Sequence, residues 1–212
     1  MSTPARVSLT SSASIVSQPS YGFEFAGNYA FYDRNGDDSI KPEYYQNLLS
    51  SAKKIVIWDP HFMEEHDGQL FEYVKTNDIE IEILTVCTKD RYAQQEQQEV
   101  IKLRDNIKNA LRKAGITRSG GYVYAFKHYN VRDYMGHRIY QCHDRFLMLD
   151  DKDLYLVGAS MNNQLGSEWN FGIMKIDYAQ DSNLFDLVNR KYNDLKNKFS
   201  ANQNGWMAKI RP

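Results

Sequence analysis

His143 and Arg145 are the two side chains in this sequence whose types and spacing best suit phosphate chemistry. They lie in a short, mostly apolar run, residues 142–150, which predicts a β-strand. Because successive side chains of a strand alternate between its two faces, His143 and Arg145 share one face and Asp144 points to the other. An imidazole beside a guanidinium can form a binding site for phosphate. The pattern therefore predicts a phosphate site on this strand.

The residues that follow extend this pattern into a longer motif. Asp150 comes four intervening residues after Arg145, and Ser160 and Asn162 follow the next predicted strand. The pattern resembles one half of the signature of the phospholipase D superfamily, in which His143, Asp150, Ser160 and Asn162 take matching positions. This resemblance implies a phospholipase-D-like α/β sandwich with a mixed central sheet flanked by helices.

The resemblance also implies a reaction. His143 would attack phosphorus and form a phosphohistidine, and a second copy of the same histidine would protonate the leaving oxygen and then activate water. Because the sequence carries a single copy of the motif, the resemblance implies a homodimer that supplies the second histidine. Arg145 would hold the nonbridging oxygens, while Asp150, Ser160 and Asn162 would orient the imidazole and line the pocket. We interpret the chain as a phosphodiesterase without a cofactor: a metal-independent nuclease, or a nuclease-like module of a prokaryotic defence or mobile-element system.

Two departures from the family pattern favour an alternative interpretation. The family has lysine where Arg145 stands, and it often has glutamate where Gly172 stands; an exchange of lysine for arginine is not neutral at a phosphate site. Residues 40–200 are also similar to the phospholipase-D-like domain at the C-terminus of MIT-domain proteins, which implies dimerisation and lipid binding without cleavage. The alternative is a noncatalytic dimerising module that binds anionic phospholipid or nucleic acid. In a purely structural domain, Arg145 would instead form a surface ion pair with Asp144 or Glu168.

Charge is distributed unevenly along the chain. Residues 51–100 hold 5 Lys and Arg against 11 Asp and Glu, whereas residues 101–150, which carry the motif, hold 10 against 4. These cations either cover the solvated face of a helix or surround the mouth of a site for an anionic polymer. The second interpretation places Arg118, Lys127, Arg132 and Arg138 at that mouth, with Asn170 as a further substrate-binding residue. The histidines lack the paired spacing of a zinc site, so we expect no metal.

The periodicity of the sequence predicts the elements that must position these residues. Helices are expected at residues 42–51, 70–75, 93–114 and 182–199, and strands at 54–59, 79–86, 121–128, 138–150, 154–158 and 171–176. Alternating helices and strands followed by a half rich in hairpins favour an α/β domain with a mixed sheet.

The remaining sequence features bear on domain organisation and location. In this chain of 212 residues, residues 1–20 are polar and lack periodicity, which predicts a flexible tail or linker before a single domain at residues 21–212. No run approaches the roughly 18 apolar residues of a membrane helix, and the first residues lack the features of a secretory signal, so we expect a cytoplasmic protein. Cys87 and Cys142 are expected to be reduced.

Overall fold

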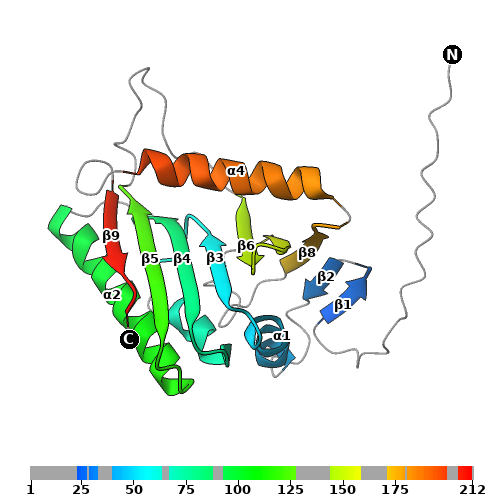
Figure 1. Cartoon of the computed structure of the whole chain (residues 1–212), viewed down its shortest axis with the longest axis horizontal. Coiled ribbons are helices and arrows are strands. Elements are labelled where there is room, and N and C mark those ends of the chain that lie inside the picture. Colours follow the sequence, from blue (N-terminus) through cyan, green and yellow to red (C-terminus); the bar gives the residue numbers. More distant parts are fainter. Residues whose placement is uncertain are drawn as a thin grey trace, which may run out of the picture.

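The fold is a mixed β-sheet with helices on both faces, seen in a computed structural model (Figure 1). The structure describes residues 23–27, 29–32, 40–63, 67–87, 93–127, 144–158, 171–179, 181–199 and 205–211. Nine strands within these ranges form one sheet in the order β1-β2-β8-β7-β6-β3-β4-β5-β9. The predicted α/β architecture with a mixed central sheet is thereby confirmed.

The strands fall into a parallel centre and antiparallel flanks. β3 (Lys54–Trp58), β4 (Ile79–Val86) and β5 (Ser119–Phe126) are parallel neighbours. The remaining strands pair antiparallel with their neighbours. They are β1 (Phe23–Ala26), β2 (Tyr29–Tyr32), β6 (Arg145–Leu149), β7 (Asp153–Val157), β8 (Phe171–Asp177) and β9 (Gly205–Lys209).

The helices cover the two faces of the sheet unequally. On one face, α1 (Ile40–Leu49), the 3-10 helix η1 (Asp67–Tyr73) and α2 (Ala93–Lys113) pack on the larger hydrophobic core. On the other, α4 (Ser182–Lys198) runs across the strands and buries Phe185, Val188 and Tyr192 in a second core (Figure 1). Side chains of β4 alternate between the two cores: Ile81 and Ile83 belong to the first and Leu84 belongs to the second.

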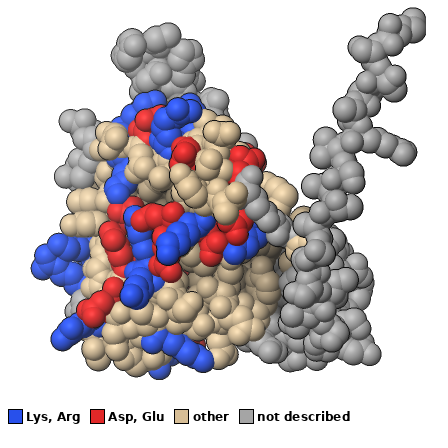
Figure 2. All heavy atoms as spheres, turned by 45° about the vertical axis from the view of Figure 1, so that its right-hand side comes forward, with Lys and Arg blue, Asp and Glu red and all other residues tan. Residues whose placement is uncertain are grey.

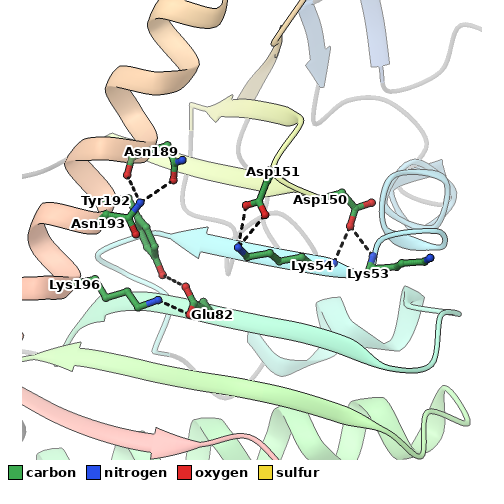
Figure 3. A network of polar contacts seen from close by, with 9 residues as sticks. All are labelled: Lys53, Lys54, Glu82, Asp150, Asp151, Asn189, Tyr192, Asn193 and Lys196. Atoms are coloured by element: carbon green, nitrogen blue, oxygen red, sulfur yellow. Dashed lines mark hydrogen bonds and ion pairs between the residues drawn. The ribbon is translucent and has the colours of Figure 1, made fainter.

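The core under α4 contains a buried charge. Glu82 is 7% exposed, and its carboxylate accepts a hydrogen bond from the Tyr192 hydroxyl at 2.9 Å and pairs with the Lys196 ammonium (Figure 3). Burial, and then the nearby Glu82, raise the pKa of Tyr192 well above its ordinary value. A buried carboxylate is tolerated when it is paired and hydrogen-bonded in this way, so this contact ties α4 to the centre of the sheet.

Most predicted elements are confirmed, with three differences. Residues 67–73 form a 3-10 helix rather than the α-helix expected at 70–75, and the strand expected at 138–150 is described only from Arg145 onward. β1, β2 and β9 were not predicted. Residues 1–20 lie outside the described residues, so the predicted tail stays a prediction. Within the described part of the chain, no helix is long and apolar enough to cross a membrane.

Candidate functional site

The residues that flank the motif in the sequence lie at one end of the sheet. We call it the carboxyl end, because the parallel strands β3, β4 and β5 finish there at Trp58, Val86 and Phe126. The antiparallel registers bring the start of β6, the end of β7 and the start of β8 to the same end. The chain leaves this end after Gly158 and returns at Phe171, so both sides of segment 159–170 are anchored there.

Arg145 stands at this end in an ion pair with a buried carboxylate. Its Nε lies 3.7 Å from Oδ1 of Asp59; the Arg145 side chain is 21% exposed and that of Asp59 is 0% exposed. Nε is buried and has no hydrogen-bond partner among the described residues. The sequence offered Asp144 or Glu168 as the ion-pair partner of Arg145; Glu168 lies outside the described residues, and the ion pair seen among those described is with Asp59, 86 positions earlier in the chain.

Asp59 is the residue of this site that the sequence analysis missed. The register of the sheet sets it beside Arg145, since the preceding Trp58 pairs with Phe146. The backbone N–H of His61 donates to Oδ1 of Asp59 at 2.9 Å, and the N–H of Asp59 donates to the Leu84 carbonyl at 3.1 Å. A charged residue directly after the apolar run Ile55–Trp58 was the available signal, because such a residue sits at a strand end.

A buried hydroxyl continues the polar row on the far side of Asp59. Trp58 also pairs with Leu84 of β4, so Thr85 is the lateral neighbour of Asp59. Thr85 is 0% exposed, and within the described part of the chain its Oγ1 has no hydrogen-bond partner. The carboxyl end thus places a guanidinium, a carboxylate and a hydroxyl on three adjacent strands, β6, β3 and β4.

Asp150 lies at the opposite end of β6 from Arg145. Five residues at about 3.3 Å per residue separate the two by about 17 Å. Its Oδ1 accepts hydrogen bonds from the backbone N–H groups of Lys53 and Lys54, each at 2.8 Å (Figure 3). The structure therefore does not bring Asp150 to Arg145; His143 lies outside the described residues, so the expectation that Asp150 orients its imidazole stays a prediction. Asp150 instead joins the end of β6 to the start of β3.

The predicted cationic mouth is divided between the two ends of the sheet. Lys127 follows β5 at the carboxyl end, with its Nζ 5.0 Å from the centre of the Trp206 ring. The Trp206 Nε1–H donates to Glu96 at 3.1 Å. Arg118 precedes β5 at the other end and pairs with Asp78, so its predicted place beside Lys127 is wrong.

The cations of α2 follow the solvated-face interpretation where their contacts are described. Arg104 pairs with Asp105, and Lys113 pairs with Glu72 of η1. On the face shown in Figure 2, Lys and Arg are interleaved with Asp and Glu rather than gathered into a field of one sign. The described residues therefore form no continuous basic surface on this face.

Six of the predicted site residues lie outside the described residues. They are Arg132, Arg138, His143, Ser160, Asn162 and Asn170. Two of them border described residues: His143 stands two positions before Arg145, and Asn170 immediately precedes β8. Among the described residues, no group of three or more His, Cys, Asp or Glu could hold a metal ion. Cys87 is buried and free, and burial raises the pKa of its thiol.

Comparisons with known proteins agree with this geometry at the level of the fold. No protein-family model and no curated protein sequence matches the chain. Among solved structures, NucT from Helicobacter pylori is similar with a TM-score of 0.50 at 13% identity, covering 82% of this chain and 98% of that chain. Nuc from Salmonella typhimurium, described as a phospholipase D family member, has a TM-score of 0.46 at 10% identity, covering 87% and 97%.

The chain shares its fold with NucT, in agreement with the α/β sandwich that the resemblance of its motif implied. At 13% identity the likeness to NucT extends to the fold and no further. The closer resemblance to the domain of MIT-domain proteins stays a prediction.

Proposed function

We propose that this chain is a phosphodiesterase of phospholipase D type that cleaves nucleic acid without a metal and works as a homodimer. The observation that carries the proposal is Arg145, whose guanidinium lies at the carboxyl end of the sheet beside the buried carboxylate of Asp59. Its support is threefold: the fold, the motif spacing around Arg145, and the return of the chain to this end on both sides of segment 159–170. A cytoplasmic role in a prokaryotic defence or mobile-element system belongs to the same proposal.

The proposed reaction proceeds in two displacements. The imidazole of His143 attacks phosphorus, a phosphorus–nitrogen bond forms, and the phosphorus–oxygen bond to the leaving group breaks. The leaving oxygen takes a proton from the partner subunit's His143, which then removes a proton from the attacking water. The deprotonated water oxygen attacks phosphorus, the phosphorus–nitrogen bond breaks, and the free imidazole of His143 is restored. Ser160, Asn162 and Asn170 line the pocket in this proposal, with Lys127 and Arg138 as outer contacts to the polymer.

Arg145 stabilises the transition state in this scheme. Charge accumulates on the nonbridging oxygens as the new bond forms, and a guanidinium offers two parallel N–H groups to such oxygens. Arginine keeps its charge at every working pH, so it cannot act as a proton donor. This division leaves proton transfer to the two histidines.

A cleavage assay in EDTA tests the proposal. Labelled single- and double-stranded DNA and RNA are incubated with the wild type and with His143→Ala, Arg145→Lys and Arg118→Ala variants. The last removes a cation at the opposite end of the sheet and is the matched control. We expect products from the wild type and from Arg118→Ala, none from His143→Ala, and slower cleavage by Arg145→Lys. Equal cleavage by His143→Ala would contradict the phosphohistidine scheme.

The ion pair itself favours one alternative, a noncatalytic module that binds phosphate groups. The Asp59 carboxylate holds the Arg145 guanidinium in place and offsets part of its positive charge. A phosphate site of this kind suits a binder as well as a catalyst. If a folded dimer releases no product from any nucleic acid, binding to nucleic acid and to vesicles of anionic phospholipid replaces cleavage as the function to measure. A binder loses ligand with Arg145→Ala and keeps it with His143→Ala.

A further inference from the structure

We propose that Asp59 is a positioning residue that orients the guanidinium of Arg145 toward the phosphate. The inference rests on the proposed function, in which Arg145 contacts the nonbridging oxygens. It adds a residue from β3 that the motif on β6 does not contain. Asp59 would act through Arg145 and would not touch the substrate.

The Asp59 carboxylate is a buried charge. The side chain of Asp59 is 0% exposed, and a carboxylate without water requires a compensating cation. The described structure supplies that cation from Arg145, across the β3 and β6 pair. Removing either charge leaves the other one partly uncompensated, so the two side chains are coupled.

One particular nitrogen of the Arg145 side chain faces Asp59. The contact is made by Nε, which is buried, and the exposed fifth of the side chain lies elsewhere on Arg145. A guanidinium carries one N–H on Nε and four on its two terminal nitrogens. With Nε turned toward Asp59, the terminal pair is left to bind two oxygens of one phosphate.

Hydrogen bonds with the backbone hold Asp59 in place. Its Oδ1 accepts from the backbone N–H of His61, and its own N–H donates to Leu84 of β4. Pro60 follows directly and restricts the backbone at this point. One backbone N–H thus holds the carboxylate and the bond to β4 holds the Asp59 backbone, while the 3.7 Å separation between Oδ1 and the Arg145 Nε exceeds hydrogen-bond length.

Charge and orientation predict opposite effects for Asp59→Asn, which makes the inference testable. The amide oxygen of asparagine still accepts from His61, but the negative charge is gone. If Asp59 mattered only through its charge, the variant would bind anions more tightly. If it positions Arg145, the variant leaves the guanidinium mobile, so its contact with phosphate weakens and turnover slows by about 100-fold.

The experiment reads Arg145 directly through the Nε–Hε signals in ¹⁵N–¹H NMR spectra. The signal is assigned by its loss in Arg145→Lys, and inorganic phosphate is titrated into the wild type, Asp59→Asn and Thr85→Val. Thr85→Val alters the other buried neighbour of Asp59 and is the matched control. We expect a distinct signal that moves with phosphate in the wild type and in Thr85→Val. In Asp59→Asn the Arg145 signal should move to the chemical shift of exposed arginines and change little when phosphate is added.

The outcomes separate this inference from the proposed function. A phosphate response that survives unchanged in Asp59→Asn overturns the positioning role alone. A wild type whose Arg145 signal ignores phosphate overturns the phosphate contact and the inference with it, whereas absence of cleavage with a normal phosphate response overturns only the nuclease. Asp59→Glu, which keeps the charge and shifts it by one methylene, serves where Asp59→Asn does not give a folded amide spectrum. Asp59→Glu should restore part of the Arg145 signal. Full loss of the signal in Asp59→Glu together with full retention in Asp59→Asn would contradict the positioning role.

Discussion

The strongest test of how this sequence uses its motif is the replacement of Asp150. The family resemblance makes Asp150 part of the catalytic set, whereas the structure gives it two backbone N–H groups to bind, at the far end of β6 from Arg145. We expect Asp150→Ala to destabilise the fold and Asp150→Asn to leave phosphodiesterase or phosphate-binding activity largely intact.

The adjacent residue provides a matched control. Asp150 and Asp151 both have φ of 54°, so replacing either one with alanine costs a similar amount, about 1 kcal/mol, for the left-handed backbone. The carboxylate of Asp151 contacts the Lys54 ammonium in an ion pair whose side chains are 31% and 59% exposed, and an exposed pair contributes at most about 1 kcal/mol (Figure 3). The difference between the two variants therefore isolates the bonds to the backbone.

The expected difference follows from those two bonds. A hydrogen bond to a charged acceptor contributes roughly 1.5–3 kcal/mol, and water can replace the acceptor at the exposed Lys53 amide, so we expect Asp150→Ala to be about 2 kcal/mol less stable than Asp151→Ala. Equilibrium unfolding in urea, followed by tryptophan fluorescence, measures both. Equal stabilities would refute the structural role, and a folded Asp150→Asn without any activity would return Asp150 to the catalytic set.

Three further substitutions test buried groups. The Tyr45 hydroxyl is buried without a partner and burial raises its pKa well above the usual 10.0, so Tyr45→Phe should gain about 1 kcal/mol at neutral pH. Because the folded pKa exceeds the unfolded one, the wild type should also lose stability as pH rises past 10.0, by up to about 1.4 kcal/mol per pH unit for this group. Tyr45→Phe should flatten that loss in urea unfolding at pH 7 and above 10, and an unchanged slope would contradict the burial argument. Thr85→Val removes a buried hydroxyl that has no bond and should be neutral or stabilising by about 1 kcal/mol in the same assay; a marked loss would mean the hydroxyl is bonded. Gly121 has φ of 119°, and an added Cβ would meet the Ile81 carbonyl oxygen at contact distance far below van der Waals limits, so Gly121→Ala should cost at least about 3 kcal/mol. Gly120→Ala, with open space around it, is the control, and similar unfolding midpoints for the two would be inconsistent with the packing of β5 on β4.

The sequence was sufficient for elements whose pattern is local. The alternation of β4 and the long amphipathic helix α2 are each visible in one window of residues, because burial on one face imposes a period of two or of 3.6. The strand bearing Arg145 was equally readable, as was the fold that its motif implied. β1, β2 and β9 were missed because short strands at the two borders of a sheet owe their structure to a neighbour rather than to their own periodicity.

The partners of the site residues were decided by tertiary structure. Arg145 had acidic neighbours in sequence, yet it pairs with Asp59 because the antiparallel register of β3 and β6 sets those two positions side by side. The same register carries Asp150 away from Arg145, since five residues of extended chain reach from one end of the sheet to the other. By itself the sequence determined which side chains could bind phosphate. Strand order and register, which depend on pairings between residues far apart in the chain, determined which of them meet.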